Sequence, residues 1–343
     1  MPGYRNDFIQ KIGSFATTIN LDNLLRWSDQ RLVLPVYHLA TDDNVPHIQH
    51  LYPVKNIDQF QIDLEFLLKY FEPIDLASLI QHVEGSKQLS KPSFHLTFDD
   101  GLQEFASTIS PILKQKGIPA TNFLNTAFID NRDLFFRYKV SLIIDQLSLS
   151  ETPLQKQIKK DFFESSSKEV SLSDLLLRLE YTDLVLIDQI AEELKIDFTD
   201  YLKGHQPYLT SMQISHLIEE GFTFGGHSID HPLLGKLPLD EQIRQTIESV
   251  ESVSHQFNLP WKTFAFPFTD YGISMHYFDH FYGDDRHLDL SFGSAGLKQD
   301  IYARHLQRIP MEMGYLPADK IIHGELLYFL MKRPFGKNYI VRK

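Results

Sequence analysis

Four short stretches of mostly apolar, β-forming residues occur along the chain, and each runs into polar residues. Such stretches are typical of buried strands. The stretches are LVLPVY (32–37), SFHLTF (93–98), GFTFGG (221–226) and TFAFPF (263–268), and they precede His38, Asp99, His227 and Asp270.

Helical patterns lie between these stretches. Phe60, Leu64, Leu67 and Phe71 are spaced three or four residues apart, which places them on one face of a helix. Strands that alternate with helices predict a parallel sheet, either closed as a barrel or doubly wound. In both arrangements the functional groups gather at the carboxyl ends of the strands.

The segment from 131 to 208 departs from this alternation. It is rich in Leu, Lys, Glu, Asp and Ser, and its only glycine is Gly204. We expect a helical insertion between two barrel strands, which serves either as a lid or partner surface or only as an elaborated connection. The remaining divisions expected are an N-terminal extension (1–31), the barrel (32–316), and a C-terminal helix with a basic, solvated tail (317–343).

Composition narrows the function classes. The chain has 343 residues with a formal net charge of −12, which disfavours binding to nucleic acid or to an acidic membrane surface. It has no cysteine, so any metal ion must be held by His, Asp and Glu. No stretch is long and apolar enough for stable membrane insertion, and no secretion signal is visible, so we expect a cytoplasmic protein.

Two groups of residues point to metal chemistry. Asp99 and Asp100 are adjacent at the end of a predicted buried strand, where two carboxylates are unfavourable unless a cation or proton joins them. His227 and His231 lie four residues apart, and Pro232 favours a turn over a helix there. Two histidines with one of the two aspartates form a recurrent zinc-binding set that leaves a position open.

These residues also form recognisable motifs. TFDDG (97–101) followed by HSIDHP (227–232) resembles the first two motifs of the polysaccharide deacetylase family, also called the NodB-homology family or carbohydrate esterase family 4. FAFPFTDYG (264–272) resembles a variant of the third motif. The resemblance spans about 32–313 and implies an α/β fold, a distorted (β/α) TIM-like barrel of about seven strands, here with the helical insertion.

The resemblance implies a role for each matching residue. Asp99 would be the general base, and Asp100, His227 and His231 would bind Zn²⁺ or another divalent transition metal. The backbone N–H of Phe268 would stabilise the oxyanion that forms when a carbonyl is attacked. The partner implied is a carbohydrate substrate.

Two features depart from the family pattern. The arginine that often orients the base in the third motif corresponds to Ala265, so another group must orient Asp99. His323 is the candidate general acid, although its surroundings also predict a C-terminal helix, and His305 is a weaker candidate. His38 either lines the site or is an ordinary histidine at a strand end.

The sequence therefore predicts a metal-dependent hydrolase that removes an N- or O-acetyl group from an amino sugar or a polysaccharide intermediate. Two alternatives stay open. One is an amidohydrolase that acts on a non-sugar amide or a cyclic imide, and the other is a non-catalytic carbohydrate-binding barrel.

Overall fold

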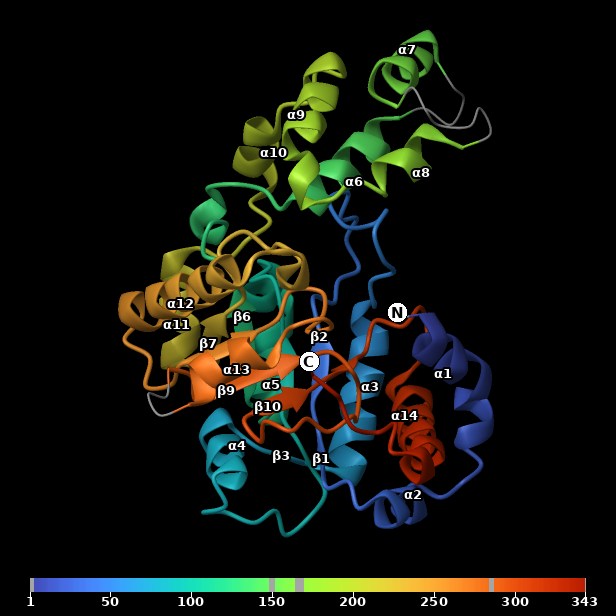
Figure 1. Cartoon of the computed structure of the whole chain (residues 1–343), viewed down its shortest axis with the longest axis vertical. Coiled ribbons are helices and arrows are strands. Elements are labelled where there is room, and N and C mark those ends of the chain that lie inside the picture. Colours follow the sequence, from blue (N-terminus) through green and yellow to red (C-terminus); the bar gives the residue numbers. More distant parts are fainter. Residues whose placement is uncertain (1–2, 148–151, 164–169, 284–286, 343) are drawn as a thin grey trace.

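A nearly closed barrel of parallel strands forms the centre of the computed structural model, which describes residues 3–147, 152–163, 170–283 and 287–342 (Figure 1). The strand order is β10-β9-β8-β7-β6-β5-β2-β11. The barrel strands are β2 (Pro35–Tyr37), β5 (Leu96–Phe98), β6 (Ala120–Leu124), β7 (Thr223–Gly226), β8 (Thr263–Ala265), β9 (Leu290–Gly293), β10 (His305–Gln307) and β11 (Ile309–Pro310). This architecture confirms the predicted (β/α) barrel.

The barrel closes where β10 passes into β11. The two are separated only by Arg308; β10 pairs with β9 and β11 pairs with β2. The N–H of Arg308 donates to the carbonyl of Gly293 at 3.2 Å, and the N–H of Ile309 donates to the carbonyl of Leu34 at 2.8 Å. One segment thus joins both edges of the sheet. If β10 and β11 are counted as one strand, the barrel has seven strands, which agrees with the prediction of about seven.

A small parallel sheet of order β1-β4-β3 lies at the amino-terminal end of β2 and β5. Its strands are β1 (Leu32–Val33), β4 (Ser93–Phe94) and β3 (Glu72–Pro73).

Helices cover the outside of the barrel. The predicted helix around Phe60 is α3, which begins with a capping box made by Asn56 and Gln59 and buries Phe60, Leu64 and Leu67. None of the helices in the described ranges is long and apolar enough to cross a membrane. The covering helices are α3 (Ile57–Tyr70), α4 (Leu76–Val83), α5 (Ser110–Lys116), α11 (Ser211–Glu219), α12 (Leu239–Gln256) and α13 (Met275–Tyr282).

The two ends of the chain pack together. Helices α1 (Gly3–Ala16) and α2 (Leu21–Ser28) contact α14 (Ala318–Lys332), which in turn contacts α3 (Figure 1). A side chain at Gly324 would approach the side chain of Ile9 to 3.0 Å, so this glycine permits the close approach of α1 and α14. The N-terminal extension is thereby attached to the barrel.

The insertion (131–208), which lies between β6 and α11, is helical and lies over the end of the barrel where the site residues are found (Figure 1). It packs its own apolar core, which includes Leu176, Ile187 and Ile190, against Leu39 and Leu102 of the loops that follow β2 and β5. Its helices are α6 (Phe136–Gln146), α7 (Pro153–Phe162), α8 (Leu172–Leu176), α9 (Leu184–Glu193) and α10 (Phe198–His205).

The C-terminal tail differs from the expectation of a solvated segment. Tyr339 bridges to Gln299, and the side chain of Arg342 is only 2% exposed. The guanidinium of Arg342 binds Asp270 and Asp300, and it lies 4.0 Å from the centre of the Phe278 ring. The tail is therefore buried at Arg342 because two carboxylates and an aromatic ring surround its charge.

Candidate active site

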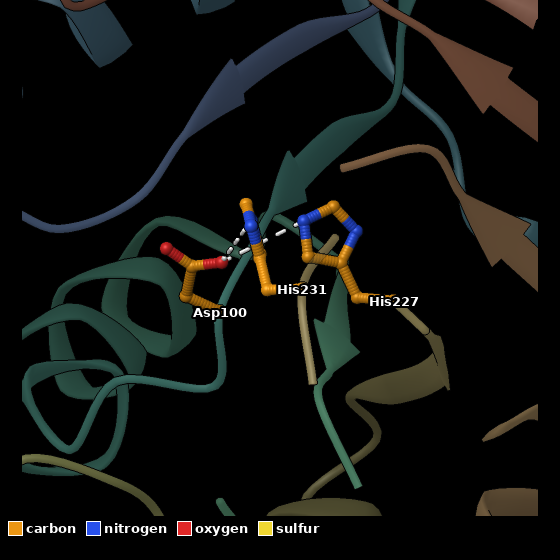
Figure 2. A group of neighbouring side chains, drawn as sticks. All are labelled: Asp100, His227 and His231. Carbon is orange, nitrogen blue, oxygen red and sulfur yellow. Dashed lines mark ion pairs between the residues drawn. The ribbon is translucent and has the colours of Figure 1, made fainter. Parts of the chain in front are cut away.

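The predicted metal ligands lie together at the carboxyl ends of β5 and β7 (Figure 2). The Oδ1 atom of Asp100 is 3.6 Å from Nε2 of His227 and 3.2 Å from Nε2 of His231. The three potential ligand atoms lie within 4.8 Å of one another, and all three residues are buried. The structure thus brings Asp100, His227 and His231 into one cluster.

The backbone reaches this cluster through tight turns. Asp100, Ser228 and His231 have φ angles of +72°, +68° and +63°, in the left-handed region that residues other than glycine seldom occupy. The hydroxyl of Ser228 accepts a hydrogen bond from the N–H of His231 at 3.0 Å, and the side-chain amide of Asn125 donates to the carbonyl of His227. Such strain is often found at functional sites, where the surrounding contacts maintain it.

The donor set fits a divalent transition metal. Apart from its contacts with His227 and His231, Oδ1 of Asp100 is buried without a hydrogen-bond partner among the described residues, which favours a cation there. Nδ1 of His227 lies 2.8 Å from the carbonyl of Ala265, which leaves Nε2 directed toward Asp100. Burial lowers the pKa of His227 to about 4, so its ring is neutral at pH 7, as a metal ligand must be.

Asp99 faces a buried arginine. Nη1 and Nη2 of Arg308 donate to its two carboxylate oxygens at 2.7 and 2.8 Å. Burial alone would raise the pKa of Asp99, but the charge of Arg308, aided by His227, holds that pKa below its usual range. The carboxylate is therefore ionised and held in one orientation, with Oδ2 3.9 Å from Nε2 of His227.

Ala265 carries no charge that could orient Asp99. Arg308 supplies the guanidinium that pairs with Asp99, and sequence reasoning missed it. The signal was an arginine inside RIPMEMG (308–314), a stretch expected to end the last barrel strand. A charged residue there requires a buried partner, because an unpaired charge in the barrel interior is strongly unfavourable.

His38, which follows β2, is held by Glu312. The backbone N–H groups of His38 and Leu39 donate to Oε1 of Glu312 at 3.0 and 3.2 Å, and Nδ1 of His38 contacts Oε2 of the same carboxylate. Burial would lower the pKa of His38, but Glu312, with Asp100 and Asp99 further away, raises it to about 9. His38 is thus a charged imidazolium at neutral pH that lines the site.

The other two histidines considered from the sequence lie elsewhere. His323 lies within α14, where Nδ1 contacts the carbonyl of Asp319 at 2.6 Å and the ring packs 6.1 Å from Phe66 of α3. Nε2 of His305 lies 3.0 Å from Oδ2 of Asp270. The structure brings neither ring to Asp99, which corrects the expectation that His323 is the general acid.

His305 belongs to a second acidic cluster with Asp270 and Asp300. Nη2 of Arg342 lies 2.5 Å from Oδ2 of Asp270 and 2.6 Å from Oδ2 of Asp300. Burial would raise the pKa of Asp270, but His305 and then Arg342 lower it. A protein guanidinium already supplies the positive charge in this cluster.

Phe268, in the third motif, borders the metal cluster. It has a φ of +58°, its ring lies 4.6 Å from the ring of His231, and 44% of the residue is exposed. Its carbonyl accepts a hydrogen bond from the Ser294 hydroxyl at 3.0 Å. Within the described ranges its own N–H has no hydrogen-bond partner, so this group is free to donate to a ligand.

The barrel holds a buried Asp-His-His set beside an aspartate that is paired with an arginine. The family model described as "Polysaccharide deacetylase" matches residues 86–164, which include Asp99 and Asp100. The resemblance predicted from the motifs is therefore confirmed. The comparison with curated proteins found no match.

Solved structures share the fold. Streptococcus pyogenes deacetylase PplD in complex with acetate is 14% identical, with a TM-score of 0.54 over 86% of this chain and 97% of that chain. IcaB from Ammonifex degensii is 13% identical, with a TM-score of 0.52 over 86% and 96%. A de-N-acetylase from Aggregatibacter actinomycetemcomitans is 13% identical, with a TM-score of 0.51 over 82% and 95%. At these identities the likeness shows a shared fold.

Proposed function

We propose that this protein is a metal-dependent deacetylase that removes the acetyl group from an N-acetylated amino sugar of a carbohydrate substrate. The observation that carries the proposal is the buried cluster of Asp100, His227 and His231, in which Oδ1 of Asp100 has no partner among the described residues besides the two imidazoles. The match of residues 86–164 to the polysaccharide deacetylase model supports it.

Asp100, His227 and His231 would hold the metal ion. Two imidazoles and one carboxylate favour Zn²⁺, and Co²⁺, Ni²⁺, Mn²⁺ and Fe²⁺ follow as alternatives. When bound, such an ion lowers the pKa of a water molecule and polarises the acyl carbonyl. The neutral state of His227 and the orphaned oxygen of Asp100 prepare the chain for this charge.

Asp99 would be the general base. It accepts a proton from the attacking water, and Arg308 keeps the carboxylate ionised and correctly directed. The N–H of Phe268 would donate to the oxygen of the attacked carbonyl as negative charge develops there. Neither role requires a particular side chain at residue 265, so Ala265 is compatible with activity.

His38 would be the general acid. As the carbon–nitrogen bond breaks, the imidazolium gives its proton to the departing nitrogen, which leaves as an amine while the acyl group leaves as acetate. Because Glu312 raises the pKa of His38 to about 9, the ring carries this proton at neutral pH. The proton held by Asp99 returns through solvent, which restores both groups for the next cycle.

The surface beside the cluster suits a sugar ring. The exposed face of Phe268 adjoins His231, and Tyr271, in the same loop, is 77% exposed. Aromatic faces pack against the C–H faces of sugars. PplD and the Aggregatibacter enzyme are named as deacetylases, and PplD binds acetate, which is consistent with acetyl transfer to water.

The proposal is tested by measuring metal content and acetate release together. We expect one equivalent of a divalent metal in the purified protein, and acetate release from N-acetylated glucosamine oligomers that stops after chelation and returns with Zn²⁺. Asp99→Asn is the matched control, because it should keep the metal and lose the activity. Absence of metal after reconstitution would contradict the proposal, and bound metal without acetate release would favour a non-sugar amide as substrate.

A further inference from the structure

The helical insertion joins the turn that carries Asp100. Where the chain leaves the insertion, the N–H of Leu209 donates to the carbonyl of Gly101 at 2.8 Å, and the N–H of Gln103 donates to the carbonyl of Pro207 at 2.9 Å. This short antiparallel bridge fixes the residues that directly follow Asp100. The last residues of the insertion therefore support the Asp99–Asp100 turn.

The start of the insertion meets the same site. The backbone N–H of Phe135 donates to the hydroxyl of Tyr208 at 3.0 Å, so the two ends of the insertion are tied together. The ring of Phe135 lies 4.1 Å from the ring of His231. One candidate ligand thus packs directly against the residue that precedes α6.

Tyr138 of α6 reaches Asp100 itself. Its hydroxyl donates a hydrogen bond of 2.8 Å to Oδ2 of Asp100, and the residue is fully buried. The hydroxyl is the donor in this bond, because a carboxylate oxygen can only accept. Oδ2 is thereby occupied, while Oδ1 faces His227 and His231.

We propose that Tyr138 is a positioning residue for the metal centre: it holds Asp100 so that a single oxygen, Oδ1, is presented to the ion. The insertion is then a working part of the site and not only an elaborated connection. This inference rests on the proposed function, because it concerns the ligand that Asp100 would supply. Groups that orient metal ligands typically change metal affinity by roughly 10-fold to 100-fold when they are removed.

A purely structural role for Tyr138 must be distinguished, because its ring also packs against Phe135 and His47. Tyr138→Phe keeps the ring and removes only the hydroxyl. Tyr201→Phe is the matched control: it lies in the same insertion, and its hydroxyl lies 2.8 Å from Nδ1 of His47 instead of meeting a candidate ligand.

The experiment measures Zn²⁺ affinity of the full chain by competition with a chromogenic chelator, the visible absorption spectrum of the Co²⁺-substituted protein, and thermal unfolding of the metal-free protein. We expect Tyr138→Phe to raise the Kd for Zn²⁺ by roughly 10-fold to 100-fold. Its Co²⁺ spectrum should also change, because the freed Oδ2 can join the ion. Tyr201→Phe should leave both unchanged, and the two metal-free variants should unfold at similar temperatures.

Three results would overturn the inference. If Tyr138→Phe bound Zn²⁺ as tightly as the wild-type protein and had the same Co²⁺ spectrum, the inference would be refuted and the proposed function would stand. A much lower unfolding temperature for metal-free Tyr138→Phe than for Tyr201→Phe would show that the hydroxyl is structural. Failure of the wild-type protein to bind Zn²⁺ or Co²⁺ would refute the proposed function, and this inference with it.

Discussion

The part of the chain that the structure describes holds two clusters of aspartate and histidine, and they balance their negative charge differently. In one, Asp270, Asp300 and His305 surround the guanidinium of Arg342. In the other, Oδ1 of Asp100 lies beside the imidazoles of His227 and His231, and no arginine or lysine among the described residues pairs with it.

The difference separates a structural cluster from a candidate metal centre that has similar residue types. A cluster with its own arginine is complete, because the cation is part of the chain. In the other cluster the described residues supply two imidazoles and no arginine, so a cation from outside would complete it. Composition alone does not distinguish the two, whereas the partner of each carboxylate oxygen does.

The largest expected difference between the two clusters appears when one aspartate is removed from each. We expect Asp100→Asn to abolish stoichiometric zinc binding and acetate release, because the only anionic ligand is lost. Asp270→Asn should keep the full metal content, because Arg342 and not a metal ion balances that carboxylate. Elemental analysis of both purified variants checks this, and metal loss in Asp270→Asn would contradict the assignment of the two clusters.

Asp99 sharpens the comparison, because it lies beside the metal cluster but is paired with an arginine. We expect Asp99→Asn to lower kcat by roughly 10²-fold to 10⁴-fold, the range for loss of a general base, while zinc stays bound. Steady-state kinetics together with metal content test this. An equal loss of zinc and of activity would instead make Asp99 a ligand.

Arg342 tests the completeness of the second cluster. Because Arg342→Met leaves two buried carboxylates without their cation, we expect the free energy of unfolding at pH 7 to fall by about 3–5 kcal/mol. Urea titration measures this value. The metal content should not change.

The stability difference between wild type and Arg342→Met should also depend on pH. The folded-state pKa of Asp270 is lowered, so its stabilising contribution is present above the unfolded pKa of about 3.9 and is lost as the pH falls below it. The stability difference between wild type and Arg342→Met should therefore shrink on acidification. A difference that grows toward low pH would contradict the pairing.

A further carboxylate, Glu312, is balanced by the protonated ring of His38. The smallest expected effect is a change in the pH dependence of activity when this pair is altered. A general acid works only while protonated, so activity should decline as the pH rises through the pKa of His38. Glu312→Gln removes the main cause that raises this pKa, so the alkaline limb of the pH–rate profile should move to lower pH. An unchanged alkaline limb would exclude His38 as the acid.

Much of the barrel was predictable because local patterns determine it. Strand-like stretches followed by polar residues placed His38, Asp99 and His227 at strand ends, and the structure has β2, β5 and β7 there. Asp100 and His231 were found for the same reason, since each lies in a short motif near a strand. Those assignments needed only neighbouring residues.

The rest of the site depends on contacts between distant residues. Arg308 meets Asp99 across 209 positions, Glu312 meets His38 across 274, and Tyr138 meets Asp100 from within the insertion. No local periodicity reveals such pairs, because each depends on how the barrel closes. His323 shows the opposite error: it matched a local motif, but α14 directs its ring to Phe66.

The closing of the sheet at Arg308 has a consequence for the order of events during synthesis. Asp99 leaves the ribosome 209 residues before the guanidinium that neutralises it. Until then, burying Asp99 would place an uncompensated carboxylate in the barrel interior, which is strongly unfavourable. We therefore expect the barrel to close only once Arg308 is available, and Asp99, the proposed base, to take its orientation when the final strand joins the two sheet edges.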